Sequence, residues 1–336
     1  MLPIQTKNLF KLDQSTLGLG CMNVSHAYGP AIDESDAIAL LQAAYDIGYR
    51  VFDTATLYAF GRNESLVAKA LGSVRGQIHL SSKCGMAGVD GKRVIDGRPE
   101  TIERQIDESL SRLQTDHIDL YSLHRVDRQV PLEDSLKPLV QAMGEGKIGA
   151  IGLSEVPASS VERALEVAPI SAVQNEYSLW SRNCEIALSD LCREKGIMLV
   201  AFSPVCRGFL GTDWANFTRF SAGDIRANMP RFQPDAIQAN RMLQAEIQVV
   251  AEDLSVSSSQ LALAWLLNKG GHVFPIPGTR SAAHLRENFE AQRLVLDGRV
   301  VARLDSIFSP ERVVGNRYPP LNQSEIDTER FDFERH

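Results

Sequence analysis

Short apolar runs alternate along the chain with segments whose apolar residues recur every three or four positions. The runs with strand character are Thr16–Leu19, Arg50–Asp53, Ile78–Lys83, Ile118–His124, Ile148–Leu153, Ala172–Gln174, Ile197–Ser203 and Val273–Ile276. Between the first two runs, a segment with helical spacing begins after the acidic residues Asp33–Asp36 and stops at Gly48. Strands that alternate with helices in this way predict a parallel sheet with crossover helices.

The other segments with helical periodicity are Glu64–Leu71, Glu100–Leu113, Leu132–Met143, Ser159–Val167, Glu185–Lys195 and Ser257–Lys269. Pro138 lies inside one of them, so that helix is expected to start late or to kink. Such a chain forms either an open doubly wound sheet or a closed barrel, and eight strands favour the barrel. We therefore expect one α/β domain over residues 1–320, a (β/α)8 TIM barrel, followed by a polar tail over residues 321–336 that packs loosely.

The connection between the seventh strand and the helix at Ser257 is much longer than the usual connection of about 4–6 residues. We expect it to be a long functional loop. It carries arginines that either close over an anionic ligand or belong to a solvated insertion. These are Arg207, Arg219, Arg226, Arg231 and Arg241.

The charge balance argues against nucleic acid as a partner. The 336 residues include 35 basic and 42 acidic side chains, a net charge of −7 that is unfavourable for binding a polyanion. No apolar run approaches the roughly 18 residues of a membrane-spanning helix. The N-terminus also lacks the pattern of a secretory signal. We therefore expect a cytoplasmic protein that binds neither nucleic acid nor a membrane.

Two motifs that suggest other chemistry are set aside. Residues 144–149 have the G-x-G-x-x-G spacing of a dinucleotide-binding turn, but here a predicted helix ends and a strand begins, which is the wrong context. The five cysteines are widely spread, without the spacing of metal ligands, and are expected to be reduced thiols. No metal centre is predicted.

The residues that point to chemistry are Asp53, Tyr58, Lys83 and His124. Asp53, Lys83 and His124 stand at the ends of three consecutive predicted strands, and Tyr58 follows in the loop after the first of them. Neighbouring strands lie about 4.8 Å apart, so their carboxyl ends bring these groups to one patch. A lone surface tyrosine or lysine is common, but four such groups at one end of a barrel favour a function.

Together these side chains form an acid for a carbonyl oxygen that gains negative charge. A phenol has an ordinary pKa of about 10, and a neighbouring ammonium stabilises the phenolate and eases proton release. Lys83 is expected to supply that ammonium, and Asp53 to hold it in place. His124 is expected to orient the carbonyl group towards the hydroxyl of Tyr58.

With these residues in place, the chain resembles the aldo-keto reductases, whose catalytic Asp, Tyr, Lys and His fall on Asp53, Tyr58, Lys83 and His124. The resemblance extends from residue 17 to residue 288. It is carried by residues 52–55 (FDTA), 151–155 (IGLSE), 173–178 (VQNEYS), 202–204 (FSP) and 276–280 (IPGTR). The sequence around Ser154 and Tyr177 resembles that of the branch of the family that includes pyridoxal reductases. The resemblance implies NADPH-dependent reduction of a small aldehyde or ketone, pyridoxal-like or otherwise polar.

The resemblance also implies where NADPH would bind. Ser154, Glu155 and Gln174 would hold the nicotinamide carboxamide, and Phe202 would stack on its ring. Arg280 would bind the 2′-phosphate and favour NADPH over NADH. The other implied cofactor residues are Gly20, Cys21, Met22, Asp53, Ser203, Pro204, Gly278 and Thr279, with Arg207, Gly208 and Leu210 in the pyrophosphate loop and His284, Glu287 and Asn288 near the adenine.

Two other functions remain open. One is an NADPH-binding redox sensor or channel-associated subunit with little turnover. The other is an aldolase in which Lys83 forms a Schiff base. The substrate is also open. Met22, Tyr28, Met86, Arg125 and residues 316–318 are candidates for the substrate pocket. Arg125 indicates an anionic or polar substrate unless it pairs with Asp127. The oligomeric state is not predicted.

Overall fold

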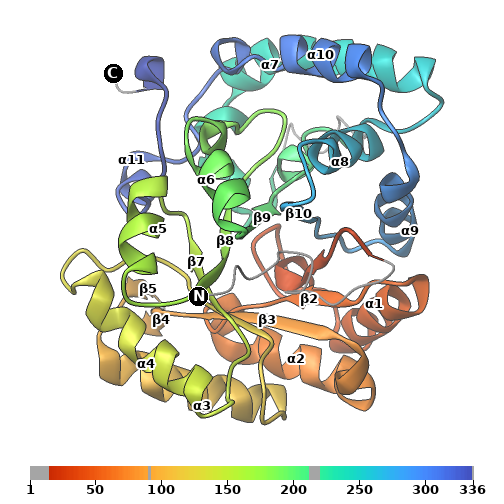
Figure 1. Cartoon of the computed structure of the whole chain (residues 1–336). Helices are drawn as coiled ribbons and strands as arrows, with labels where there is room; N and C mark the ends of the chain where they lie inside the picture. Colours follow the sequence, from red (N-terminus) through yellow and green to blue (C-terminus); the bar gives the residue numbers. More distant parts are fainter. Residues whose placement is uncertain (1–14, 90–91, 212–219, 335–336) are drawn as a thin grey trace.

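The structure, a computed structural model, describes residues 15–89, 92–211 and 220–334. Eight parallel strands form a sheet in the order in which they are named here. They are β1 (Leu19–Gly20), β2 (Val51–Asp53), β3 (His79–Cys84), β6 (Leu120–Leu123), β7 (Ile151–Ser154), β8 (Ile170–Glu176), β9 (Met198–Phe202) and β10 (Val273–Ile276). Each predicted strand overlaps one of these strands, and the (β/α)8 barrel is confirmed (Figure 1).

Hydrogen bonds between the first and last strands close the barrel. The amides of Gly18 and Gly20 donate to the carbonyl oxygens of Pro275 and Pro277, each at 3.0 Å. This seam needs a residue without a side chain, because a Cβ at Gly278 would lie 2.8 Å from the carbonyl oxygen of Gly20. The closed sheet therefore depends on close backbone contact between β1 and the turn after β10.

Helices surround the barrel. They are α1 (Glu34–Ile47), α2 (Arg62–Leu71), α3 (Pro99–Leu113), α4 (Leu132–Gly144), α5 (Ala158–Leu165), α6 (Leu188–Lys195), α7 (Pro234–Asp253), α8 (Ser258–Asn268), α9 (Ala282–Glu290), α10 (Gly298–Ile307) and the short α11 (Pro320–Gln323). On α3, for example, Ile102, Ile106 and Leu113 are buried at helical spacing. The main apolar core lies between this helical layer and the sheet.

A second apolar cluster fills the interior of the barrel. It consists of Val51, Leu120, Ala150, Ala172, Met198, Val200, Phe274 and Ile276. Successive side chains on a strand alternate between its faces, so Asp53 on β2 points to the same side as Val51. His124, four residues after Leu120, likewise follows the inward face of β6. Alternation therefore directs these polar groups into the barrel at its carboxyl end.

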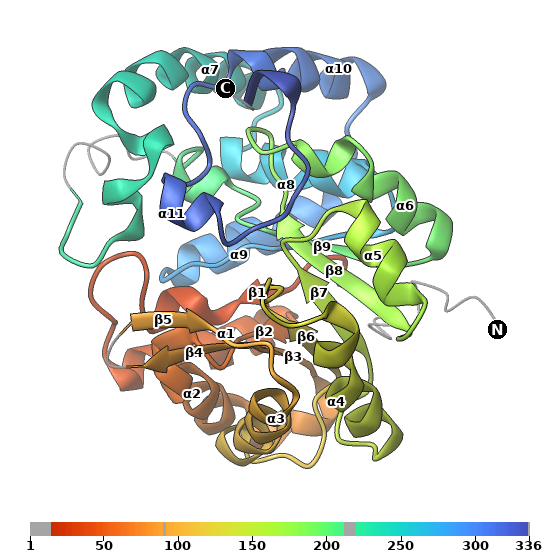
Figure 2. The same ribbon diagram turned by 90° about the vertical axis from the view of Figure 1, so that its left-hand side faces the viewer.

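The helices and strands of the structure differ from the sequence predictions at three places. The long connection after the seventh strand is not simply a loop, because it contains the 20-residue helix α7, which buries Leu243, Ile247 and Val250. Helix α4 starts at Leu132 and holds Pro138 inside it, so the late start is wrong, whereas the kink stays a prediction. Residues Met86–Val89 (β4) and Lys92–Ile95 (β5) form an antiparallel pair that was not predicted, seen in Figure 2 outside the barrel sheet.

The tail is attached more firmly than the sequence suggests. Ile326 is buried, and the side chain of Glu329 accepts a hydrogen bond of 2.8 Å from the amide of Ala158. The amide of Asn183 donates to the carbonyl oxygen of Glu329 at 3.1 Å. The expectation of loose packing is therefore wrong for the described part of the tail.

Candidate active site

Asp53, Tyr58, Lys83 and His124 meet at the carboxyl end of the barrel. The Nζ atom of Lys83 lies 2.6 Å from Oδ2 of Asp53, 2.8 Å from the carbonyl oxygen of Thr54 and 3.3 Å from the hydroxyl of Tyr58. The ring of Tyr58 meets the ring of His124 edge to face, with 5.8 Å between their centroids. The juxtaposition expected from the strand ends is therefore present.

Lys83 keeps its charge although it is fully buried. Burial disfavours the ammonium, but the carboxylate of Asp53 and the hydroxyl of Tyr58 outweigh it and raise the pKa of Lys83. Asp53 is itself held by the hydroxyl of Ser81 at 3.0 Å and by the amide of Gln174 at 2.9 Å. The ammonium is thus fixed beside the phenol by a carboxylate with three hydrogen-bond donors.

Tyr58 holds its proton more firmly than the sequence argument implies. Burial raises the pKa of Tyr58, and Lys83 opposes this shift without reversing it. The expectation of an eased proton release is therefore only partly right. At neutral pH the phenol is protonated, and the adjacent ammonium stabilises charge that forms when the proton leaves. After Tyr58 the chain turns sharply, with positive φ at Ala59, Phe60 and Gly61.

His124 is neutral at physiological pH, and a ring nitrogen of its buried side chain is unpaired among the described residues. Burial lowers its pKa well below the usual value, and the charges of Arg125 and Lys83 lower it further. Its Nδ1 atom is buried and has no hydrogen-bond partner among the described residues. A neutral imidazole at this position offers a donor or an acceptor to a bound polar group.

Several residues expected to bind a cofactor surround this group. Ser154 ends β7 and Phe202 ends β9. Gln174 lies near the end of β8, in register with Ser154. Gln174 contacts the site directly through Asp53. Ser203 and Gly208, which follow β9, have positive φ values of 52° and 85° and bend the chain there.

A buried ion cluster that the sequence did not reveal lies beside the site. Its members are Glu155, Glu176, Arg207, Arg231 and Arg317, all almost inaccessible to solvent. Arg317 lies 2.7 Å from Glu155, and Arg207 lies 2.6 Å from Glu176. Burial of Glu176 opposes its charge, but the arginines lower its pKa to about 2. The cluster links the ends of β7 and β8 to the chain beyond α10.

The cluster engages two side chains expected at the cofactor. The carboxylate of Glu155 accepts from Arg317 and from the amide of Glu176 at 2.9 Å. Arg207 donates to Glu176 and, at 3.0 Å, to the hydroxyl of Tyr318. The side chains of Cys21 and Leu210 are buried in the apolar core.

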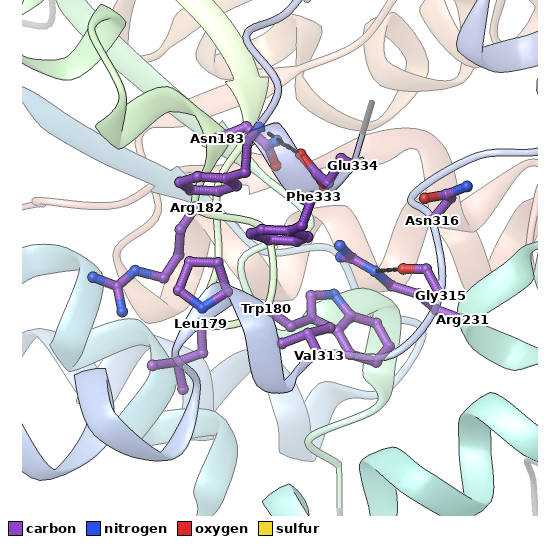
Figure 3. A pocket seen from close by; sticks show the side chains of 12 residues that line it. Leu179, Trp180, Arg182, Asn183, Arg231, Val313, Gly315, Asn316, Phe333 and Glu334 are labelled. Atoms are coloured by element: carbon purple, nitrogen blue, oxygen red, sulfur yellow. Dashed lines mark hydrogen bonds between the residues drawn. The ribbon is translucent and has the colours of Figure 1, made fainter. Parts of the chain in front are cut away.

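Arg231 of this cluster also lines a cavity of about 250 Å³ (Figure 3). Trp180, Arg231 and Phe333 line it, and Arg231 donates to the carbonyl oxygen of Gly315 at 3.0 Å. Asp53, Tyr58, Lys83 and His124 contribute no residue to its lining, so this cavity is separate from the candidate site.

The region expected to bind the cofactor's adenosine end lies at the start of α9. Nε of Arg280 donates to the carbonyl oxygen of Asn23 at 2.7 Å, whereas its Nη2 is buried without a hydrogen-bond partner among the described residues. His284 is exposed, Asn288 is buried, and Glu287 accepts a hydrogen bond from the hydroxyl of Ser257. Of these side chains, Arg280 has a donor available for an anion.

In residues 15–89, 92–211 and 220–334, no helix combines the length and the apolar character needed to cross a bilayer. Over the same residues, no cluster of three or more His, Cys, Asp or Glu side chains is arranged to hold a metal ion. The long loop's Arg219 lies outside the described residues.

Comparisons with known proteins agree on one family. Residues 16–309 match the family model described as Aldo/keto reductase family. The chain is 36% identical over 330 residues to "Aldo-keto reductase yakc (NADP(+))" of Schizosaccharomyces pombe, covering 96% of this chain and 97% of that protein. It is 37% identical over 307 residues to "Probable aldo-keto reductase 1" of Glycine max, covering 90% and 88% of the two chains.

Solved structures agree as well. The glycerol dehydrogenase of Gluconobacter oxydans superposes with a TM-score of 0.81 at 26% identity, covering 92% of this chain and 96% of that one. An aldo/keto reductase of Klebsiella pneumoniae, solved with NADP and acetate, gives a TM-score of 0.68 at 26% identity over 91% and 95% of the chains. From the match over most of its length and these relatives, the chain belongs to the aldo/keto reductase family.

Proposed function

We propose that this protein is an oxidoreductase that uses NADPH to reduce an aldehyde or ketone to the alcohol, with Tyr58 as the proton donor. The observation that carries the proposal is the contact of the Tyr58 hydroxyl with a buried, charged Lys83 next to His124. The NADP(+) in the name of the S. pombe relative and the NADPH bound in a K. pneumoniae structure support the cofactor.

The other two functions considered from the sequence are less well supported. The relatives reported above are named as reductases or dehydrogenases, which does not favour a sensor with little turnover. An aldolase needs a neutral lysine amine as its nucleophile. Lys83 is instead held as an ammonium by Asp53, which disfavours Schiff-base chemistry.

The residues at the barrel mouth fit NADPH. Arg280 has a buried Nη2 donor without a partner among the described residues, and a 2′-phosphate would accept a hydrogen bond from it. Ser154 and Gln174 offer a hydroxyl and an amide to the carboxamide, and Phe202 offers a ring face to the nicotinamide. Glu155 is engaged by Arg317, so we assign the carboxamide to the other two residues. When bound, NADPH supplies the hydride.

The proposed roles of the four catalytic residues follow from their contacts. His124 donates a hydrogen bond to the carbonyl oxygen and holds it near the hydroxyl of Tyr58. Tyr58 gives its proton to that oxygen as negative charge develops on it. Lys83 stabilises the phenolate that remains, and Asp53 keeps the ammonium charged and in place.

Turnover with NADPH tests the proposal directly. The protein would be mixed with NADPH and a panel of aldehydes and ketones that includes pyridoxal, and the loss of reduced-nicotinamide absorbance would be followed. We expect catalytic turnover with at least part of the panel. Tight binding of NADPH without turnover of any compound would instead support the sensor.

Replacing Arg280 with alanine is expected to raise KM for NADPH about 10–100-fold, because a charge-assisted contact with the 2′-phosphate is lost. NADH lacks this phosphate, so its KM should change much less. Steady-state kinetics with both cofactors measure the effect. Arg286→Ala removes an exposed arginine of α9, the helix that follows Arg280, and serves as a control. Equal losses for NADPH and NADH would rule out the phosphate role.

The rate of carbonyl reduction is expected to be level between about pH 6.5 and about pH 10. Burial raises the pKa of Tyr58 above its usual value of 10.0, so the acid keeps its proton at higher pH. Burial also lowers the pKa of His124 below 6.5, so the imidazole stays neutral at lower pH. The pH profile of kcat/KM measures both limits, and a transition near pH 8 would contradict these directions.

A further inference from the structure

Arg125 follows the catalytic His124 directly, at the end of β6. Its Nη1 atom donates to the carbonyl oxygen of His124 at 2.6 Å and approaches the hydroxyl of Ser154 to 3.3 Å. The side chain is only half-buried. These contacts fix the guanidinium between the histidine that we assign to the carbonyl oxygen and the serine that we assign to the nicotinamide.

Arg125 does not pair with Asp127, which was the structural alternative considered from the sequence. The carboxylate of Asp127 accepts instead from the amides of Gly97 and Gln129, at 3.0 and 2.9 Å. Within the described ranges, no carboxylate lies within salt-bridge distance of Arg125. Its positive charge is therefore uncompensated by a neighbouring side chain there.

A second arginine, Arg93, lies near Arg125, but its charge is compensated by Glu325. Arg93 belongs to β5, and burial lowers its pKa, with a further contribution from the charge of Arg125. Arg93 forms an ion pair with Glu325 of the tail. The ion pairs Arg93–Glu325 and Lys83–Asp53 each have a net charge of zero, and His124 is neutral. Arg125 therefore leaves this group of side chains with an excess of positive charge. A bound anion would compensate it.

We propose that Arg125 binds an acid group of the substrate, so that the preferred substrates are carbonyl compounds with a carboxylate or phosphate group near the carbonyl carbon. This inference rests on the proposed function and specifies the substrate class of the same site. The carbonyl oxygen of such a compound lies between Tyr58 and His124. Its carboxylate or phosphate lies against the guanidinium of Arg125. Reduction turns the carbonyl into a hydroxyl and leaves the acid group unchanged.

Matched pairs of aldehydes test the inference. For the wild type, kcat/KM would be measured with 4-carboxybenzaldehyde against 4-methylbenzaldehyde, and with glyceraldehyde 3-phosphate against glyceraldehyde. We expect the charged member of at least one pair to be preferred. In Arg125→Gln that preference should fall about 10–100-fold, through KM rather than kcat, because a charge-assisted hydrogen bond is lost.

Two further variants separate charge recognition from a structural role. Arg125→Lys should recover part of the preference, because it restores the charge without the planar fork of the guanidinium. Arg128→Gln removes a nearby arginine with 65% side-chain exposure that pairs with Asp327, and should keep the wild-type preference. If Arg125→Gln keeps the wild-type preference, or if the wild type shows none in either pair, the inference is wrong.

Failure of the inference and failure of the proposed function give different results. Turnover of neutral aldehydes without an acid preference overturns the inference and leaves the reductase intact. If no aldehyde is reduced, calorimetric titration of benzoate and benzamide into the protein with NADP+ still tests the inference. Tighter binding of benzoate that is lost in Arg125→Gln supports it, and equal binding of the two compounds overturns it.

Discussion

Replacing Tyr58 with phenylalanine is expected to lower kcat for carbonyl reduction about 10²–10⁴-fold, the usual contribution of a positioned general acid. The variant keeps the ring, which lies 4.9 Å from the ammonium of Lys83 and against His124, and loses only the hydroxyl. Packing at the barrel mouth should therefore be preserved. The carbonyl oxygen then lacks its proton donor while the residues assigned to NADPH are unchanged.

The measurement is steady-state reduction of an aldehyde with NADPH, together with the Kd of NADPH from its fluorescence. We expect kcat to fall and the Kd to stay close to that of the wild type. Tyr45→Phe serves as the matched control. It removes an exposed hydroxyl of α1 that donates a hydrogen bond to Gln77. A Tyr58→Phe protein with wild-type kcat would show that the proton comes from another group.

Replacing Arg317 with methionine is expected to lower the free energy of unfolding by about 3–5 kcal/mol, the usual cost of breaking a buried ion pair from one side. Arg317 lies 2.7 Å from Glu155 and 3.4 Å from Glu176, and all three side chains are buried. Methionine leaves Glu155 without its main countercharge. Arg207 still pairs with Glu176, so the damage centres on the end of β7.

Urea unfolding followed by circular dichroism measures this loss. Arg312→Met is the control, because Arg312 forms an ion pair with Glu246 in which both side chains are about 40% exposed, and such pairs contribute about 0–1 kcal/mol. Adding Glu155→Gln to Arg317→Met should recover part of the loss, since the unpaired charge is removed. Equal small losses for Arg317→Met and Arg312→Met would refute the account of the cluster.

The barrel and the juxtaposition of Asp53, Tyr58, Lys83 and His124 were predictable because both follow from local patterns. The strand runs are short and apolar, and Asp53, Lys83 and His124 stand where such strands end, which in a parallel barrel is a single patch. The turn at residues 144–149 was also judged correctly. Helix α4 ends at Gly144, and Gly146 has a φ of 78°, so these glycines end a helix.

The parts that were missed depend on pairing across long stretches of chain. Glu155 and Arg317 are 162 residues apart, and nothing near either residue signals the other. The hairpin of β4 and β5 lacks apolar alternation, because its second strand Lys92–Ile95 is largely exposed. Helix α7 was missed because the connection was interpreted through its arginines, of which only Arg241 lies in the helix. Its Pro234 is at the first turn, a position that tolerates proline.

The direction of the pKa shift of Tyr58 was also predicted wrongly from the sequence. The sequence places an ammonium beside the phenol, but the degree of burial is a property of the closed barrel. Burial raises the pKa of Tyr58 more than Lys83 lowers it. The lysine therefore acts on the charge that appears as the proton leaves, while the resting phenol stays protonated.

A crystal structure of the protein with NADP+ and a bound carbonyl compound tests the central claim most directly. The account predicts that the carbonyl oxygen lies about 2.6–3.2 Å from the hydroxyl of Tyr58 and within hydrogen-bond distance of His124. Lys83 should remain in contact with Tyr58 and Asp53. A carbonyl oxygen bound away from Tyr58, or a Tyr58 side chain separated from Lys83 in the complex, would contradict it.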